Sequence, residues 1–287
     1  MKTFIFSIDV EDWFQVENLR TVVNYEEWDE KELRVEKSTA IILDILDKHE
    51  VKATFFILGW IAERCPDLVR QISSKGHEIA SHGYAHKLLH EMDSAEVRED
   101  LLKSLEILQP LSSNNIIGYR SPSFSITDKS ADIMNELGFK YDASYNKFQF
   151  NERYGEVIVE SKKGQSYLEN GLLEFPVTYN TYFGVHWPLG GGYFRLSPSW
   201  FINKQIKDSF RKNDIANIYL HPWEFDRGQS RVSGLKLSLK FRHYYGLKQT
   251  ASKLTRLIKN IKNSSNIFIT TYSDIISNLT ELDKSKG

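Results

Sequence analysis

The chain of 287 residues has a single cysteine, Cys65, and one thiol cannot form an intramolecular disulfide. No apolar run approaches the roughly 18 residues that suggest a membrane span. The short apolar stretch 3–8 leads into acidic residues without the cleavage pattern of a signal peptide, so we predict that it is the first strand. These absences exclude a disulfide-based scaffold and predict a cytoplasmic protein with no transmembrane segment.

Nucleotide-binding motifs are also missing. The glycine triplet 190–192 lacks the spacing of a dinucleotide-binding fingerprint, and no stretch matches a phosphate-binding P-loop. The net charge of −1 shows no overall basic excess, and we expect no nucleic-acid partner. With 41% hydrophobic residues, the composition instead indicates a globular fold with a substantial core.

Positive charge is distributed unevenly along the chain. Residues 227–262 contain ten Lys or Arg and no Asp or Glu. The sequence favours a solvated helix face whose charges pair with acids elsewhere in the fold. The alternative is a surface for an anionic partner, and an acidic polysaccharide or a lipid-phosphate carrier would fit.

Predicted strands and helices alternate along the chain. Apolar, β-branched or aromatic runs predict strands at 3–8, 51–58, 77–80 and 116–119, a short strand reaching Asp142, and strands at 156–160, 172–177, 217–220 and 267–270. Apolar residues at helical spacing predict helices at 36–49, 66–74, 93–108, 128–137, 198–210 and 247–261, then a last short helix. The sequence DSAE at 93–96 predicts a capping box at the start of the third of these helices. This alternation favours a mainly parallel sheet covered by helices, and we predict an α/β fold of the irregular β/α barrel type. We expect one domain, 1–287, on which residues from about 227 to 287 pack as a C-terminal extension.

Two histidines lie four residues apart in the hexapeptide SHGYAH at 81–86, directly after a predicted strand. One helical turn brings positions i and i+4 onto one face, so His82 and His86 can bind one metal ion. A pair of solvated surface histidines is the alternative, and it would be favoured if the motif stood alone. A β/α barrel, however, gathers the C-terminal ends of its strands, where catalytic residues lie. Five polar residues follow predicted strands in this way: Asp9, His82, Arg120, Asp142 and His221.

The acidic sequence DVED at 9–12 supplies carboxylates at the end of the first predicted strand. Two imidazoles and one carboxylate form a common site for a catalytic divalent metal. Arg120 would compensate the crowded negative charge and leave one carboxylate free to act as a base. An acidic solvated turn is the alternative.

Either Glu11 or Asp12 can be the metal carboxylate. Strand alternation points Glu11 to the same side as Asp9, whereas Asp12 faces the site only if the chain curls into a helical turn after Asp9. The aromatic pair at 13–14 suggests a chain that folds back onto apolar surface. The sequence therefore favours Asp12 as the ligand, with Glu11 accepting hydrogen bonds from neighbouring donors.

His221 follows the predicted strand 217–220 and precedes two carboxylates in 222–226. A carboxylate partner stabilises an imidazolium near neutral pH, so His221 is well placed as a general acid. The alternative is a core histidine bonded to the backbone. The aromatic stretch 179–194 indicates either a sugar-binding rim, since aromatic faces stack on sugar rings, or ordinary packing.

These motifs resemble, in the same order, those of the polysaccharide deacetylases of carbohydrate esterase family 4, the NodB-homology domains. The resemblance extends over about residues 4–270. It rests on SIDVED at 7–12, SHGYAH at 81–86, GYRSP at 118–122, YDAS at 141–144 and YLHP at 219–222. Two further phrases, ATFFILG at 53–59 and HPWE at 221–224, are similar to a subgroup associated with bacterial exopolysaccharide loci that also serve exosortase systems.

The resemblance implies a distorted barrel that hydrolyses an N-acetyl group on an amino sugar. It assigns the metal to His82 and His86, the activation of the attacking water to Asp9 and the orientation of Asp9 to Arg120. It also assigns the protonation of the leaving amine to His221 and a catalytic part in tuning His221 to Asp142. Zn²⁺ suits two imidazoles and a carboxylate, with Co²⁺, Mn²⁺ or Ni²⁺ as alternatives. The chain departs from the family twice, because Val10 separates Asp9 from the next carboxylate and the Asp142 motif lacks a tryptophan often found near it.

The expected substrate is an N-acetylated oligo- or polysaccharide of bacterial origin, or its precursor. Two other activities remain open at the same site, the hydrolysis of a non-sugar amide and that of a sugar O-acetyl ester. A non-catalytic saccharide-binding module is a further alternative. All the expected metal-binding and acid/base residue types are present, which favours an enzyme.

Overall fold

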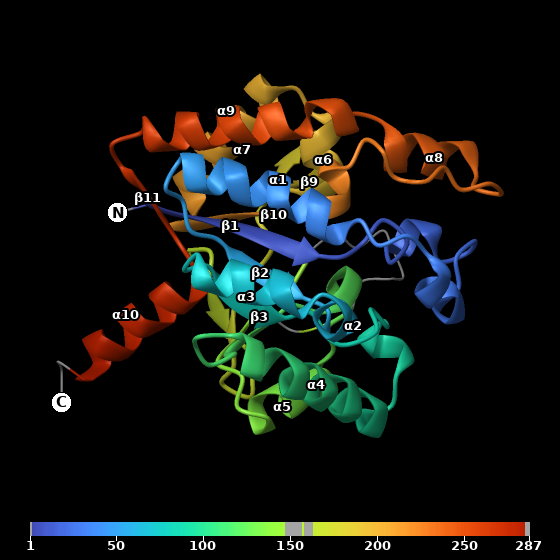
Figure 1. The fold of residues 1–287 in the computed structure, drawn as a ribbon. Coiled ribbons are helices and arrows are strands. Elements are labelled where there is room, and N and C mark those ends of the chain that lie inside the picture. The colour runs from blue at the N-terminus through green and yellow to red at the C-terminus, as the bar shows by residue number, and fades with distance from the viewer. Residues whose placement is uncertain (1, 147–156, 158–162, 285–287) are drawn as a thin grey trace.

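The computed structural model describes residues 2–146, 157 and 163–284 (Figure 1). The strands are β1 (Lys2–Val10), β2 (Thr54–Ile57), β3 (Glu78–Ser81), β4 (Gly118–Tyr119), β5 (Tyr141–Asp142), β6 (Ser166–Tyr167), β7 (Leu173–Glu174), β8 (Tyr179–Tyr182), β9 (Val185–Pro188), β10 (Ile215–Leu220) and β11 (Ile267–Thr270). The helices are α1 (Val35–Lys48), α2 (Gly59–Arg64), α3 (Pro66–Ser74), α4 (Ser94–Leu108), α5 (Asp128–Glu136), α6 (Gly191–Leu196), α7 (Ser199–Lys212), α8 (Leu237–Tyr244), α9 (Thr250–Lys262) and α10 (Tyr272–Lys284). Short 3₁₀ turns include η1 (Glu17–Leu19), η2 (Tyr25–Glu30) and η6 (Pro222–Phe225).

The main sheet is organised around β1. Its strands follow the order β10-β1-β2-β3-β4-β5-β7-β6, and all pairs are parallel except β6 with β7. One edge of β1 pairs with β10, while the other pairs first with β11 and then with β2. Figure 1 shows the helices around the outside of this curled sheet, with α1, α7 and α9 at the top and α4 and α5 at the bottom. The prediction of an irregular β/α barrel is confirmed.

Alternate residues of β1 belong to different layers. Phe4 and Phe6 pack in the large apolar core with residues of α1 and α9, whereas Ile5 packs in an inner cluster with residues of β2, β3, β5 and β7. Because side chains alternate along a strand, Ser7 and Asp9 share the inner face with Ile5. The alternation therefore places Asp9 inside the barrel at the C-terminal end of β1.

Local sequence signals explain several helices. Pro66 occupies the first turn of α3, whose bounds match the prediction. Asp93 caps α4 by accepting hydrogen bonds from the N–H groups of Ala95 and Glu96, and the Glu96 carboxylate accepts one from Asp93 N. The predicted capping box is confirmed.

Other predictions differ from the structure. The strand predicted at 51–58 is shorter in the structure, and its C-terminal end is set by α2, which begins at Gly59. Gly59 lies close to Tyr84, because an added Cβ would be 2.8 Å from the Tyr84 ring. The helix expected at 247–261 begins at Thr250 after a 3₁₀ turn. Sequence patterns do not predict α6, α8 or the β8–β9 hairpin. The predicted strand 156–160 lies outside the described residues except for Val157.

The glycine triplet brings the chain close to β10. Gly190 has a φ of +148° and forms a parallel bridge with Tyr219, and a Cβ at Gly190 would lie 2.4 Å from the Tyr219 carbonyl oxygen. Only glycine permits this approach. Gly190 therefore serves the contact with a neighbouring strand.

A buried side chain, Asn217 of β10, joins the two ends of the curled sheet. Its Nδ2–H donates to the Pro176 carbonyl (2.8 Å), its Oδ1 accepts from Thr178 N (3.1 Å), and its own N–H donates to Thr178 Oγ1 (2.8 Å). Residues 176–178 follow β7, at the other end of the sheet. Side-chain hydrogen bonds thus close the barrel where no continuous strand pair does so among the described residues.

The segment expected to pack as a C-terminal extension also contributes to the sheet. It supplies β11, which pairs with β1, and its last helix begins with Tyr272, which is buried in the inner cluster. Within the described residues, no helix combines the length and the apolar composition needed to cross a membrane.

We expect Asn217→Leu to lower the free energy of unfolding by about 2–4 kcal/mol, because it leaves the buried Pro176 carbonyl and Thr178 N–H unpaired. Urea unfolding followed by circular dichroism measures the change. Asn260→Leu, at an exposed position on α9, is the control and should stay within about 0.5 kcal/mol of the parent. Equal unfolding midpoints for the two variants would show that Asn217 does not hold the barrel closed.

Candidate active site

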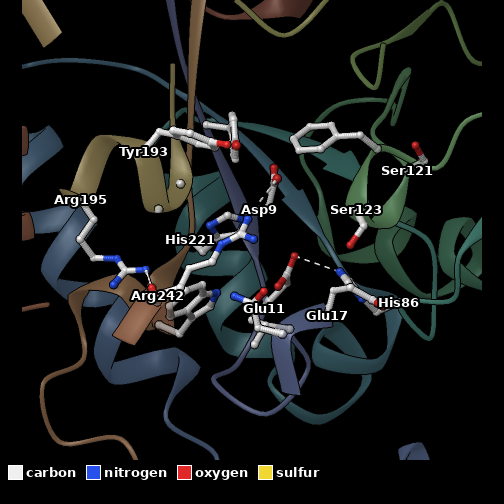
Figure 2. Close-up of a pocket in the computed structure, with 17 residues that line it drawn as sticks. Asp9, Glu11, Glu17, His86, Ser121, Ser123, Tyr193, Arg195, His221 and Arg242 are labelled. Carbon is white, nitrogen blue, oxygen red and sulfur yellow. Dashed lines mark hydrogen bonds and ion pairs between the residues drawn. The ribbon is translucent and has the colours of Figure 1, made fainter. Parts of the chain in front are cut away.

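A pocket opens where β1, β3 and β10 end (Figure 2). Its lining includes Asp9, Glu11, His86, Tyr193, Tyr219 and His221. Segments far apart in the sequence therefore meet at the strand ends, as a β/α barrel requires.

Glu11 and His86 line the pocket, and with the buried His82 their side chains converge on one point. Glu11 Oε1 lies 3.2 Å from His82 Nε2 and 3.1 Å from His86 Nε2. One ligand atom from each residue lies within 4.8 Å of the other two. This donor set of two imidazoles and one carboxylate fits a zinc-like divalent ion.

Hydrogen bonding fixes how His82 faces this point. Its Nδ1 lies 2.7 Å from the carbonyl oxygen of Arg120, and a carbonyl can only accept, so Nδ1 carries a proton. In the neutral ring, Nε2 then directs its lone pair towards the Glu11 carboxylate. Two lone pairs facing one another repel unless a cation lies between them, which is the arrangement of a metal ligand.

The charges in this group are strongly coupled. Burial raises the pKa of Glu11, but the nearby His86 and His221 charges outweigh it and hold the pKa below its usual value. Burial lowers the pKa of His86, but the Glu11 charge outweighs it and raises the pKa overall. The group therefore attracts positive charge, either as protons or as a metal ion.

The structure gives Asp12 a different position from the one that the sequence favours. Its Oδ1 accepts from Trp13 N (2.7 Å), and its Oδ2 accepts from the backbone N–H groups of Arg34 (2.6 Å) and Val35 (2.8 Å) at the start of α1. Burial raises the pKa of Asp12 to about 6, although these donors act in the opposite direction. The preference for Asp12 as the metal ligand was wrong, because its carboxylate caps α1 while Glu11 lies beside both imidazoles.

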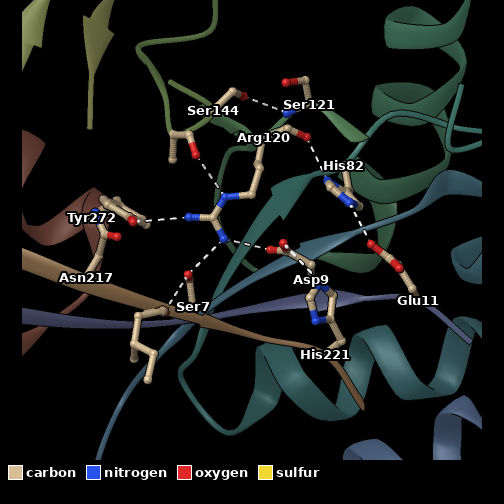
Figure 3. Close-up of polar contacts among 12 residues, drawn as sticks. Ser7, Asp9, Glu11, His82, Arg120, Ser121, Ser144, Asn217, His221 and Tyr272 are labelled. Carbon is tan, nitrogen blue, oxygen red and sulfur yellow. Dashed lines mark hydrogen bonds and ion pairs between the residues drawn. The ribbon is translucent and has the colours of Figure 1, made fainter. Parts of the chain in front are cut away.

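Arg120 is buried and holds Asp9 from inside the barrel (Figure 3). Its Nη1 donates to Asp9 Oδ1 (2.7 Å) and to Ser7 Oγ (2.8 Å), its Nε–H donates to the Ala143 carbonyl (2.9 Å), and its Nη2 donates to Tyr272 Oη (3.2 Å). The contact between Arg120 and Asp9 that the sequence predicts is present. Nothing in the sequence pattern indicates Tyr272.

His221 lies on the other side of Asp9. Its Nε2 is 3.8 Å from Asp9 Oδ2, and its Nδ1 is 3.1 Å from Glu224 Oε2. Burial lowers the pKa of His221, but Glu11, Glu224 and Asp9 outweigh it and raise the pKa to about 9. The imidazole is therefore protonated at neutral pH, as a general acid must be.

A buried arginine supports Glu224. Arg195 Nε–H donates to Glu224 Oε1 (3.0 Å), and Arg195 also donates to the carbonyls of His243 (3.0 Å), Tyr245 (2.5 Å) and Arg242 (2.8 Å). Glu224 lies in the acidic stretch predicted beside His221. Arg195 was missed, and no sequence signal distinguishes it from other arginines.

Asp142 ends β5 as predicted, but the structure places it away from the chemistry. Its carboxylate accepts from Ser144 N (2.8 Å) and Ser144 Oγ (2.7 Å), and Ser144 Oγ in turn accepts from Ser121 N (2.7 Å). Among the described residues, no contact joins Asp142 to His221 or Asp9. The catalytic assignment of Asp142 is corrected to a support of the loop after Arg120, because Glu224 occupies the position beside His221.

The aromatic stretch 179–194 is mainly packing. Trp187 contacts Phe201 and Tyr193 edge to face, with ring centroids 5.5 and 5.9 Å apart. Of the aromatic side chains in this stretch, Tyr193 lines the described pocket. At this pocket, Tyr193 is therefore the one aromatic residue of the stretch that is placed to contact a sugar.

Comparison with known proteins adds two family matches. Residues 26–141 match the model described as polysaccharide deacetylase, and residues 143–267 match one described as a domain of unknown function (DUF3473). A peptidoglycan-N-acetylglucosamine deacetylase of Bacillus cereus is 31% identical over 149 residues, covering 47% of this chain and 54% of the relative. Residues 26–141 are therefore similar to the polysaccharide deacetylase family. The predicted resemblance to this family is confirmed, and the narrower exopolysaccharide-locus subgroup stays a prediction.

Solved structures agree with the fold of this chain. A Mycobacterium smegmatis protein described as a candidate polysaccharide deacetylase matches with a TM-score of 0.64 and 19% identity, covering 98% of this chain and 91% of that structure. A carbohydrate esterase family 4 pseudoenzyme of Bacillus anthracis matches with a TM-score of 0.55 and 16% identity, covering 95% and 64%. The chain spans about half the length of the curated relatives it matches.

Glu11→Gln should weaken metal binding by about tenfold or more, because it removes one of the three converging ligand atoms. Asp12→Ala should keep the metal but lower the free energy of unfolding by about 1–2 kcal/mol, because it removes the cap of α1. Zinc titration and urea unfolding measure the two effects, with folding of each variant checked by circular dichroism. The opposite ranking of metal affinities would restore Asp12 as the ligand.

Proposed function

We propose that the protein is a metal-dependent hydrolase that removes N-acetyl groups from the amino sugars of a bacterial polysaccharide or its precursor. The observation that supports it most is one pocket in which a Glu11–His82–His86 group lies beside a carboxylate held by Arg120 and a protonated imidazole. Relatives named as peptidoglycan-N-acetylglucosamine deacetylase and chitooligosaccharide deacetylase support the reaction class.

Glu11, His82 and His86 would hold the metal, with Zn²⁺ first and Co²⁺, Mn²⁺ or Ni²⁺ as alternatives. When bound, the ion would supply Lewis acidity that polarises the acetamide carbonyl and makes water a better nucleophile. His82 keeps its ligand nitrogen free because its other nitrogen donates to the Arg120 carbonyl.

Asp9 is the proposed base. The Arg120 guanidinium donates to its Oδ1, while its Oδ2 faces the pocket towards His221. Asp9 takes a proton from the attacking water as the water oxygen bonds to the carbonyl carbon. Arg120 is therefore a positioning residue.

His221 is the proposed acid. The proton on Nε2 passes to the sugar nitrogen as the carbon–nitrogen bond breaks, which leaves acetate and a free amine. Glu224 accepts the Nδ1–H hydrogen bond, which fixes the ring and stabilises its charged form. Asp9 and His221 thus face the same reacting group from neighbouring strands.

A second hollow supports an oligomeric substrate. It shares Val16, Glu17 and His86 with the first pocket and extends to Tyr25 and Arg20 on the long β1–α1 connection. An aromatic ring and polar groups beside the reacting position suit another sugar unit. A small non-sugar amide would leave this hollow unused.

We further propose that 1–287 forms one domain, because both matched stretches contribute strands to one sheet. The cytoplasmic location stays a prediction from the sequence.

Acetate and free amine should be released together from N-acetylated chitooligosaccharides, and more efficiently from longer oligomers. Asp9→Asn and His221→Ala should each lower kcat about 100-fold or more while keeping the metal, since each removes a positioned proton transfer. Asp44→Asn and His90→Ala, both at exposed positions, are the matched controls and should keep parental turnover.

The outcomes separate the alternatives. Release of alcohol without amine from O-acetylated sugar would identify an esterase, and a preference for small non-sugar amides would identify another amidase. Oligosaccharide binding without turnover by the metal-loaded protein would identify a binding module. Normal turnover in His221→Ala would remove this histidine from the mechanism.

Glu224→Gln should move the alkaline limb of the kcat profile to lower pH by on the order of one unit. Glu224 raises the pKa of His221, so without its charge the imidazolium loses its proton at lower pH and the acid disappears earlier. Rates measured across neutral and alkaline pH test this, with Glu99→Gln at an exposed position as the control. An unchanged alkaline limb would show that His221 does not act as the acid.

A further inference from the structure

Helix α8 turns an apolar row to solvent. Leu237 is 84% exposed, Phe241 56% and Tyr245, just beyond the helix, 55%. These residues lie four apart and so share one face, and the Phe241 and Tyr245 rings stack with centroids 4.6 Å apart. The helix is anchored at its C-terminal end, where His243 and Tyr244 are buried. The exposed row therefore projects from a helix that the fold holds at that end.

Cations surround this row without acidic partners. Of the ten Lys and Arg in 227–262, only Lys262 lies within 4.0 Å of a carboxylate among the described residues, Glu50 at 3.9 Å. Pairing with acids elsewhere in the fold, which the sequence favours, therefore does not account for this charge. Lys253 is buried and donates to the carbonyls of Arg195 and Ser197, so it belongs to the fold and not to the surface.

A hollow continues the row towards α9. It is lined by Leu196 and Tyr245 on its apolar side and by Lys248 and Arg256 as exposed cations. We call the set Leu196, Leu237, Phe241, Tyr245, Lys236, Lys240, Lys248 and Arg256 the α8 surface. It combines protruding apolar groups with flexible cations.

The α8 surface adjoins the candidate active site. Figure 1 shows α8 at the right, on the side to which β1 points, projecting beyond the body of the barrel. The Arg242 side chain lines the pocket, and its carbonyl accepts from Arg195, which holds Glu224 (Figure 2). A molecule held at the α8 surface would thus lie beside the pocket mouth.

We propose that the α8 surface binds an anionic lipid membrane. Leu237, Phe241 and Tyr245 enter the head-group region, while the surrounding lysines and Arg256 pair with lipid phosphates. An acidic polysaccharide would use the cations but would leave the protruding apolar groups in water, so the combination favours lipid. The placement beside the pocket indicates that the sugar substrate is presented on a lipid carrier, a consequence that rests on the proposed function.

Cosedimentation of the full chain with vesicles tests the proposal. The protein should bind vesicles of equal parts phosphatidylcholine and phosphatidylglycerol and should not bind phosphatidylcholine alone. Two double variants should each weaken binding about tenfold or more. The apolar variant carries Leu237→Ser and Phe241→Ser, and the charge variant carries Lys240→Glu and Lys248→Glu. Phe268→Ser on β11 and Lys212→Glu on α7, both exposed, are the matched controls and should bind as the parent does.

Each other outcome overturns the proposal. No binding to the anionic vesicles would reject a membrane surface. A different set of results would assign the surface to an acidic polymer. Soluble dextran sulfate would then compete with vesicles, the charge variant would no longer bind it, and the apolar variant would bind vesicles as the parent does.

Activity on soluble chitooligosaccharides separates the two proposals. The apolar variant should keep the parental kcat/KM there, because Leu237 and Phe241 do not line the pocket. A protein that binds vesicles but releases no acetate contradicts only the proposed function. A protein that deacetylates soluble oligosaccharide but ignores vesicles contradicts only the membrane surface.

Discussion

The buried guanidinium of Arg120 is the constraint on which the rest of the site depends. A charge that is removed from water is tolerated only when its donors are paired, and Arg120 achieves this with groups of β1, the segment after β5 and α10. The Phe56 ring lies 4.1 Å from the guanidinium carbon and covers its face. Because these partners come from both ends of the chain, one side chain ties the barrel together at the level of the pocket.

The same residue links the two halves of the proposed chemistry. Its side chain holds Asp9, and its carbonyl sets the tautomer of His82. A shift of β4 would therefore disturb the base and a metal ligand at once. On the far side of Asp9, the Arg195–Glu224 pair does for His221 what Arg120 does for Asp9, so two buried arginines position the base and the acid.

The sequence predicts the parts of this structure that depend on local order. Alternating apolar runs, the capping box at Asp93 and the histidine spacing at 81–86 indicate the strands, a helix start and the imidazole pair. The local sequence does not show whether Glu11 or Asp12 is the metal ligand. The Asp12 carboxylate accepts hydrogen bonds from the start of α1, more than twenty residues away in the sequence.

The same limitation applies to the support of His221. Motif position selects Asp142 as a residue that acts with it, yet the structure places Glu224 there, held by an arginine from α6 that no pattern indicates. Long-range pairings of this kind are visible only once the barrel has brought separate segments together.

The first strand of the chain pairs mainly with the last ones. The partners of β1 include β10 at Ile215–Leu220 and β11 at Ile267–Thr270, which a ribosome makes long after β1. Until then one edge of a strongly apolar strand has no partner, and closing the loops that bring these segments together is slow. Because its lining includes His221 and Arg242, the pocket cannot form until these late segments have been synthesised.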